Sequence, residues 1–366
     1  HVASRPRGFG GMLTLCRVAA AFVVASARDV TIPDAPWRVE LHVHLDGAVD
    51  VPDLYTLCVS RRLEIPGVGV PSTQKVLRAY IESFPIWQRF DVVNDIVGGD
   101  VGSIRQTAEN FLASQVRSGV KYTEVRYDPV RLSHSSLANT SISEEAVVSA
   151  IQEGLATGAA RYGVVAYQIL VAMRGQTAQR CMDTAMLASR MRSEEMGGVV
   201  GLDLAGDEID YPNKEYIPCM RYAKATLGMN TTVHAGEFNQ TSYEEVRSAL
   251  IEMDVDRIGH GYAAAYDADT LALLKVRNTH LEACPASARS HGPKELEAIG
   301  IYQRLGMNFG LNTDDPSSFI GNTSMASVEA IVADELNFTE GDVRRAYEHA
   351  ASAVFGRLIP KGAVHV

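Results

Sequence analysis

Two histidines, His42 and His44, are separated by one residue within the apolar run 39–45. Side chains two positions apart in a β-strand point to the same face, so both imidazoles can reach one point in space. Imidazole nitrogens are frequent ligands of zinc and other transition metals, and two of them supply half of a four-ligand site. The spacing therefore predicts a metal centre beside this strand.

Polar residues also follow three later apolar runs, and they are of the kinds that bind metals or carry protons. Adjacent carboxylates near a protein core are costly unless a cation or a proton compensates their charge, so the acidic pair among them also suggests a metal. With the first pair, these residues provide what a hydrolytic zinc enzyme needs. The residues concerned are His234, Glu237, His260, Asp314 and Asp315.

The number of metals follows from a residue type that is missing. Barrel hydrolases with two metals commonly bridge them with a carbamylated lysine on a middle strand. No lysine occurs between Lys121 and Lys214. The sequence therefore favours a single metal, and three histidines with one aspartate favour zinc with an open position for water.

Eight short β-rich runs alternate with longer segments of helical spacing from Trp37 onward. The alternation predicts a (β/α)8 barrel of the TIM type, in which polar residues just beyond the strands meet at the C-terminal rim. The predicted strands are residues 39–45, 121–127, 164–171, 199–204, 230–234, 256–260, 279–284 and 307–311. The helical patterns are residues 107–116, 146–155, 178–191, 243–253 and 269–276.

Residues 37–366 are expected to form one domain. The long stretch between Asp46 and Lys121 predicts additional helices, some of them over the barrel mouth, and residues 338–358 predict a closing helical tail. The formal net charge of −10 and the lack of a basic cluster interleaved with aromatic residues argue against a nucleic-acid partner. No apolar run is long enough to predict a membrane span.

Residues 1–36 are predicted to be an extension outside the domain. They contain several arginines and no acidic residue before Asp29. If translation starts at Met12, the apolar residues 18–24 resemble a short secretory signal, and the same composition suits an organellar presequence or an unreliable gene start. We expect a cytoplasmic protein, or a secreted or organellar one if the segment is a genuine targeting signal.

The cysteines are five, scattered, and free of any CxxC spacing, which argues against a disulfide framework or a thiolate zinc site. They are predicted to be thiols of the core. Their positions are Cys16, Cys58, Cys181, Cys219 and Cys284.

The motifs as a set resemble the adenosine deaminase family, over roughly residues 37–358. They are residues 40–47, 203–208, 234–237, 259–262, 284–285 and 311–316. The resemblance implies hydrolytic deamination of adenosine and 2′-deoxyadenosine to inosine and deoxyinosine with release of ammonia, a reaction of purine salvage. It also implies one zinc ion per chain and a small-molecule substrate; the oligomeric state stays open, and a monomer is plausible.

Carried over position by position, the resemblance implies a role for each candidate residue. The zinc ligands would be His42, His44, His234 and Asp314. His260 would orient the attacking water and accept its proton, Asp315 would hold the hydroxyl and the purine edge, and Glu237 would protonate N1, for which its pKa must be raised. His44 would also contact the substrate, the backbone N–H of Gly206 would meet N3, and Asp46 would bind the ribose 5′-hydroxyl.

Two departures from the family pattern accompany the resemblance. The chain has Ala286–Ser287–Ala288 where the family often has Ser followed by Asn or Ser. It also has Asp128 where a Ser is frequent, and this carboxylate could alter the pocket or pair with Arg131.

Three different functions would fit parts of the same pattern. A deaminase of adenine or AMP would share the zinc site, but adenine-specific relatives typically carry Glu in place of Asp46, and no phosphate-binding cluster is evident. A binuclear amidohydrolase is disfavoured by the missing lysine. A secreted growth-factor-like relative usually has a long additional N-terminal domain, for which residues 1–36 are too few.

Overall fold

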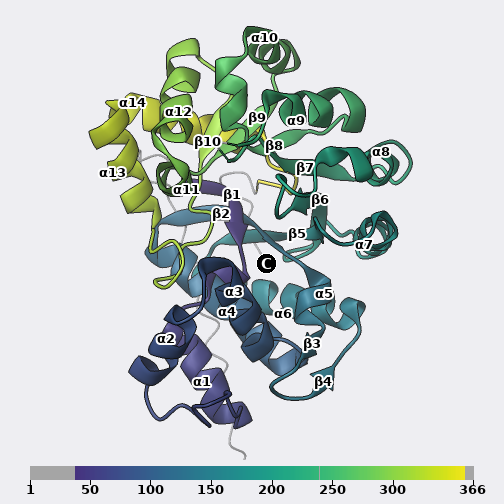
Figure 1. The fold of residues 1–366 in the computed structure, drawn as a ribbon, viewed down its shortest axis with the longest axis vertical. Helices are drawn as coiled ribbons and strands as arrows, with labels where there is room; N and C mark the ends of the chain where they lie inside the picture. Colours follow the sequence, from purple (N-terminus) through teal and green to yellow (C-terminus); the bar gives the residue numbers. More distant parts are fainter. Residues whose placement is uncertain (1–37, 239, 359–366) are drawn as a thin grey trace, which may run out of the picture.

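The computed structural model describes residues 38–238 and 240–358. Eight parallel strands follow one another around a barrel, each paired with the next (Figure 1). The TIM-type barrel predicted from the sequence is confirmed, and the predicted strand bounds agree to within two residues at either end. The strands are β1 Arg38–His44, β2 Val120–Tyr127, β5 Val165–Met173, β6 Val199–Ala205, β7 Asn230–Ala235, β8 Arg257–His260, β9 His280–Ala283 and β10 Phe309–Leu311.

The seam between β10 and β1 is closed by a single β-bridge and a side chain. Asp314 N donates to His42 O at 3.1 Å, and His44 N donates to Asp314 O at 3.0 Å. Nearer the bottom of the barrel, Asn312 Oδ1 accepts from the backbone N–H groups of Leu41 and His42 at 2.7 and 3.1 Å. The backbone of Asp314 is thereby held between the two histidines of the first motif.

Helices surround the barrel as the periodicity predicts, although residues 243–253 form a short α-helix that continues as a π-helix. The outer helices are α4 Val101–Arg117, α6 Glu144–Tyr162, α7 Ala178–Arg190, α8 Ile217–Ala225, α9 Tyr243–Ser248, η3 Ala249–Met253, α10 Ala268–Arg277, α11 Pro285–His291, α12 Pro293–Leu305 and α13 Met325–Leu336. Short elements in the connections are η1 Asp46–Ala48, α5 Pro129–Leu132, β3 His134–Ser135, β4 Thr140–Ser141, η2 Asn213–Glu215 and η4 Tyr262–Tyr266.

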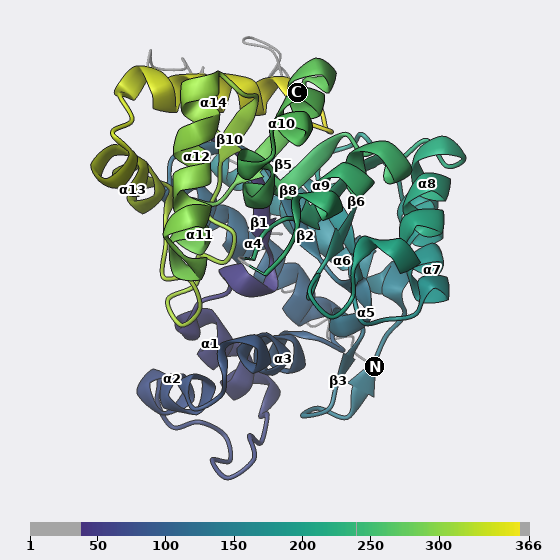
Figure 2. The ribbon, with the colours of Figure 1, turned by 45° about the horizontal axis from the view of Figure 1, so that its top comes forward.

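The two ends of the barrel are covered differently (Figure 2). The insertion predicted over the mouth forms α1 Val51–Arg61, α2 Gln74–Glu82 and α3 Ile86–Val97. Arg78 on α2 and Arg89 on α3 hydrogen-bond to the loop after β10, at Ser318 Oγ (2.7 Å) and Phe319 O (2.6 Å). At the opposite end lies α14 Glu340–Ser352, so the predicted closing tail is helical over the first part of its length.

A layer of buried charges lies inside the barrel beneath the mouth. Arg257 forms ion pairs with Glu124 and Glu282, each at 2.7 Å, and all three side chains are essentially inaccessible to solvent. The guanidinium of Arg257 also lies 3.6 Å from the centre of the Phe355 ring. Ions in so dry an interior are stable only when paired, so the barrel core depends on this network as well as on apolar packing.

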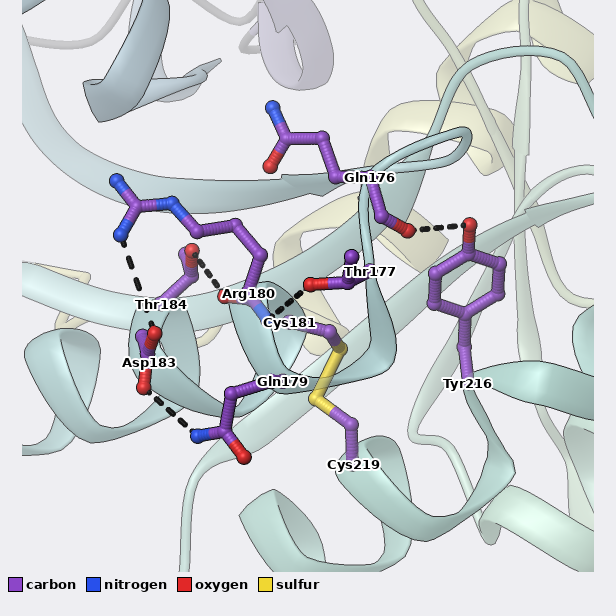
Figure 3. Close-up of a disulfide and its surroundings, with 9 residues drawn as sticks. All are labelled: Gln176, Thr177, Gln179, Arg180, Cys181, Asp183, Thr184, Tyr216 and Cys219. Carbon is purple, nitrogen blue, oxygen red and sulfur yellow. Dashed lines mark hydrogen bonds and ion pairs between the residues drawn. A yellow bond between two sulfur atoms is a disulfide. The ribbon is translucent and has the colours of Figure 1, made fainter.

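The expectation that all cysteines are core thiols is wrong for two of them. Cys181 on α7 and Cys219 on α8 form a disulfide (Figure 3). The pairing joins residues 38 positions apart, which become neighbours because α7 and α8 pack side by side on the barrel. Cys58 and Cys284 are buried thiols as predicted, and Cys16 lies outside the described residues.

The extension predicted at residues 1–36 also lies outside the described residues. Among the helices that the structure does describe, none combines the length and the apolar character that a membrane crossing requires.

Candidate active site

Three of the four predicted metal ligands converge with His260, a predicted base, at the C-terminal mouth of the barrel. One ligand atom from each of His42, His234, His260 and Asp314 lies within 4.8 Å of the others. His44 borders the same group, because its Nε2 is 3.2 Å from His234 Nε2 and 3.5 Å from Asp314 Oδ1. The strand spacing of the first motif thus brings both imidazoles to one point, and the group could bind a metal ion.

The polar atoms at the centre of this group fit a cation. Within residues 38–238 and 240–358, the buried nitrogens His42 Nε2 and His260 Nε2 have no hydrogen-bond partner, although Asp314 Oδ1 lies 3.4 Å from the former. A buried polar atom without a partner is costly, and coordination to a metal would remove that cost. Imidazole nitrogens with one carboxylate are also the donor set of many zinc sites.

Two buried carboxylates orient His42 and His234 through Nδ1, the ring nitrogen that faces away from the centre of the group. Glu282 Oε2 lies 2.8 Å from His42 Nδ1, and Asp203 Oδ2 lies 3.1 Å from His234 Nδ1. Arg126 joins the two carboxylates, at 2.8 Å from Asp203 and 2.7 Å from Glu282. Such pairs hold each ring so that its Nε2 faces the centre. No role was predicted for these three residues from the sequence, although a charged residue within each of the buried runs of β2, β6 and β9 is a signal that could have indicated them.

The pKa values of three groups suit metal binding. Burial would raise the pKa of Asp314, but its hydrogen bond with His42 and the charge of that imidazole hold the pKa well below its usual range. Burial and Arg126 lower the pKa of His42, but its contacts with Asp314 and Glu282 outweigh them and raise it, so metal binding must displace a proton from this ring. Burial lowers the pKa of both His44 and His260 well below the usual value for histidine. At neutral pH the carboxylate is therefore ionised and these two imidazoles are neutral, as a ligand or a base requires.

Two residues of the site have an unfavourable backbone conformation. His260 and Asp314 have φ values of 64° and 65°, in the left-handed region that residues other than glycine seldom adopt. Each such residue costs on the order of 1–3 kcal/mol and persists only where the surroundings impose it. For Asp314 the two backbone hydrogen bonds across the barrel seam impose it, which ties the closure of the barrel to the position of a predicted ligand.

Glu237, the predicted proton donor, lies in the turn after β7. The carboxylate of Glu208 holds this turn by accepting from Gly236 N at 2.9 Å and Glu237 N at 2.6 Å. Burial raises the pKa of Glu237 against the opposing effect of a hydrogen bond with His291, and the charge of Asp314 adds to the effect of burial. Glu208 was noted only as part of a motif, and His291 was not predicted at all.

His260 and Asp315 complete the predicted proton-handling groups. His260 Nε2 is 3.7 Å from Glu237 Oε1, and its Nδ1 is 3.2 Å from Tyr262 Oη. Asp315 packs so closely on Gly47 that a Cβ there would lie 1.8 Å from Asp315 Oδ1, which explains the glycine in the first motif. Burial raises the pKa of Asp315 well above its usual range, together with the charges of Asp314 and other carboxylates.

Asp46 lies on the same rim as the metal group. Its Oδ2 accepts from Asn94 Nδ2 of α3 at 2.8 Å, and its Oδ1 accepts from Gly47 N at 3.1 Å. Burial raises its pKa, with the Asn94 hydrogen bond acting in the opposite direction. Asn94 was not predicted, because the helix that carries it belongs to the long insertion.

Asp128 lies close enough to Asp46 for their charges to interact. It caps α5 by accepting from Val130 N at 2.8 Å, and it also accepts from Gln176 Nε2 at 3.2 Å. Burial, aided by the charge of Asp46, raises its pKa to about 6. Arg131, its suggested partner, forms its ion pair with Asp91 instead, so Asp128 remains at the rim.

The two remaining sequence features are located as follows. Gly206 follows β6 with φ 108°, a conformation that favours glycine, and a Cβ there would lie 3.2 Å from Met173 Cε. The atypical residues 286–288 lie in the first turns of α11, whose last residue, His291, contacts Glu237.

Comparisons with known proteins agree with this fold. A family model described as adenosine deaminase matches residues 37–358. The adenosine deaminase of Danio rerio is 30% identical over 335 residues, which cover 87% of this chain and 90% of the relative. An amidohydrolase structure from B. ambifaria with bound zinc has a TM-score of 0.74 at 21% identity, over 88% of this chain and 86% of that one. An adenine deaminase structure from Arthrobacter aurescens has a TM-score of 0.73 at 21% identity, over 88% of this chain and 95% of that one.

Proposed function

Because this chain belongs to the adenosine deaminase family, we propose that it hydrolyses adenosine and 2′-deoxyadenosine to inosine and deoxyinosine, releasing ammonia. The observation that carries the proposal is the placement of Glu237, a buried carboxyl with a raised pKa, 3.7 Å from His260 in the group of imidazoles. An acid, a base and a metal site at one point are what hydrolytic deamination of a purine requires.

We assign the metal site to one zinc ion, with His42, His44, His234 and Asp314 as ligands. When bound, zinc supplies the Lewis acidity that makes water a nucleophile at neutral pH. The carboxylates behind His42 and His234 hold both rings in the tautomer that presents Nε2 to the metal. His44 is the more exposed ligand, with 18% of its side chain accessible, so it is the one placed to touch the substrate as well.

The chain's own residues then move two protons. His260, neutral because of its burial, accepts a proton from the attacking water as the oxygen adds to C6. Glu237 gives its proton to N1, which takes up the electron pair displaced from the ring C=N bond. Asp315 orients the water from the opposite side. The proton taken up by His260 then passes to the amino group, the C6 hydroxyl gives its proton back to the Glu237 carboxylate, and the C6–N bond breaks with loss of ammonia as the C6=O bond forms.

The rim residues favour a nucleoside over a nucleotide. Asp46, held by Asn94, can accept a hydrogen bond from a ribose 5′-hydroxyl. Asp128 lies close enough to Asp46 for their charges to interact. A 5′-phosphate would therefore lie beside two carboxyl groups rather than a cluster of basic side chains. This supports adenosine over AMP. Adenine stays a second candidate substrate, because the Arthrobacter aurescens enzyme has the same fold.

A substrate panel tests the proposal directly. The purified protein is incubated with adenosine, 2′-deoxyadenosine, adenine and AMP, and the loss of the adenine absorbance band is followed. We expect turnover of the two nucleosides only, with one zinc per chain by elemental analysis. Turnover of adenine or AMP alone would replace the proposed substrate, and two metals per active chain would contradict the single-zinc assignment.

A further inference from the structure

A histidine at the barrel mouth contacts the proposed acid, Glu237, but takes no part in the proposed proton transfers. His291 is the last residue of α11, and its Nε2 lies 3.1 Å from Glu237 Oε1 and 3.3 Å from Ser287 Oγ. Its ring and that of Phe238 form a T-shaped pair, with the ring centres 4.7 Å apart. About 20% of the side chain is exposed, so His291 stands between the buried carboxyl and the outside.

We propose that His291 is a positioning residue that donates Nε2–H to Glu237 Oε1 and thereby keeps the acidic proton of Glu237 on Oε2. The proposal rests on the proposed function, in which Glu237 protonates the purine. A neutral carboxyl group has one O–H donor and one carbonyl acceptor. If Oε1 is held as the acceptor, Oε2 must carry the proton.

The opposite arrangement would trap the proton. If Nε2 of His291 were unprotonated, Glu237 would have to donate from Oε1 toward the histidine, and the proton would point to the mouth instead of to the substrate. The charges around His291 disfavour this state. Nε2 faces two oxygens, Glu237 Oε1 and Ser287 Oγ, so the neutral tautomer that carries its proton on Nε2 already provides the donor. Burial lowers the pKa of His291, but the hydrogen bond with Glu237 and nearby carboxylates, Asp314 and Glu295 among them, raise it, so the surroundings also favour a proton on the ring. Nε2 therefore keeps its proton, as the donor role requires.

Glu237 is consequently held at two independent points. Glu208 fixes its backbone through two N–H donors, and His291 fixes its carboxyl group. A restrained carboxyl loses less conformational freedom when the substrate binds, and catalysis by proton transfer depends strongly on such alignment. Ser287, one helical turn earlier on α11, lies against the same nitrogen, with its Oγ 3.3 Å from His291 Nε2.

The test compares two variants with a control on the same helix. His291→Ala removes the donor, and His291→Gln keeps an amide N–H of similar reach. We expect kcat to fall about 10-fold or more in His291→Ala, the scale of one hydrogen bond to a charged or reacting group, with KM nearly unchanged. His291→Gln should recover most of the loss. Ser290→Ala, whose hydroxyl bonds only to Ser287 O of α11, is the control for disturbance of the helix and should leave kcat unchanged.

A second measurement is independent of turnover. The infrared carbonyl band of protonated Glu237, identified by its disappearance in Glu237→Gln, reports hydrogen bonding at the carbonyl oxygen. Loss of the His291 donor should shift this band to higher frequency in His291→Ala but not in His291→Gln or Ser290→Ala. An unmoved band, or a kcat that His291→Gln does not recover, would overturn the proposal.

The double variant shows whether His291 acts through Glu237. In a Glu237→Gln background, His291→Ala should cost little more than Glu237→Gln alone, because the proton that it orients is gone. If the losses in kcat of the two single variants multiply in the double variant, His291 does not act through Glu237 and the positioning role is contradicted.

The test of His291 can be told apart from the test of the proposed function. If the protein turns over adenine or AMP instead of adenosine, the same variants are measured with that substrate. If it turns over no purine, the proposed function fails, while the infrared measurement still decides the role of His291.

Discussion

Neutralising Glu282 should weaken metal binding although this residue is not a proposed ligand. Its carboxylate accepts from His42 Nδ1 at 2.8 Å, Arg126 Nη2 at 2.7 Å and Thr232 Oγ1 at 3.0 Å, and it pairs with Arg257 Nε at 2.7 Å. All of these side chains are buried. In Glu282→Gln the remaining carbonyl oxygen can still accept from His42, so the orientation of that ring is largely kept, whereas the negative charge is lost and an amide donor faces the other partners.

The expected losses in unfolding free energy and in metal affinity follow from these contacts. Breaking a buried ion pair from one side costs about 3–5 kcal/mol of unfolding free energy, and we expect the lower end because Arg126 keeps Asp203 and Arg257 keeps Glu124. Loss of a carboxylate behind a metal-binding histidine typically weakens metal affinity about 10–100-fold. At about 1.36 kcal/mol per tenfold change, this corresponds to about 1.4–2.7 kcal/mol.

Chelator competition measures zinc affinity, and denaturant unfolding of the metal-free protein measures stability. Glu329→Gln is the matched control, because Glu329 accepts two hydrogen bonds from Arg38 at 2.7 and 2.6 Å but lies at the periphery with 24% of its side chain exposed. The control should lose at most about 1 kcal/mol of stability and keep its zinc affinity. Wild-type zinc affinity in Glu282→Gln would refute the argument that this network supports the ligands.

Four further outcomes are expected. Glu237→Gln should keep zinc and fold but lose about 100-fold or more in kcat, the scale of general acid catalysis; near-normal kcat would remove Glu237 from the mechanism. Asp46→Ala should lower kcat/KM for adenosine about 10-fold or more and matter far less for 5′-deoxyadenosine, whereas equal losses would show that Asp46 does not read the sugar. Replacing Cys181 and Cys219 by Ser should lower the unfolding free energy by up to about 4 kcal/mol, because the disulfide closes a loop of 38 residues. Peptide mapping without reductant should recover the linked pair. Such a pair would favour a secreted or organellar location over the cytoplasm. Burial would raise the folded pKa of Asp203, but contacts with His234 and Arg126 outweigh burial and depress it. Its contribution to stability is therefore complete above about pH 5 and is lost progressively as the pH falls below about 4 toward the depressed folded pKa, so thermal unfolding of the metal-free protein should move to lower temperature below about pH 4 in the wild type and less in Asp203→Asn.

The sequence by itself determines the features that depend on local periodicity. Alternation of side chains along a strand places His42 and His44 on one face, and the eight β-rich runs with their intervening helical patterns imply a barrel. A barrel in turn gathers strand-end residues at one rim, which is why His234, His260 and Asp314 could be predicted to meet before any contact was known.

Tertiary structure alone decides which residues support that site. Glu282 is 240 positions from His42 and His291 is 54 from Glu237, and these pairs meet only because the barrel closes and α11 packs over its mouth. The same holds for the disulfide between adjacent outer helices. A single strand or helix has a period that sequence displays, but contacts between elements depend on which neighbours the fold provides and how far each side chain reaches, and no local pattern encodes those distances.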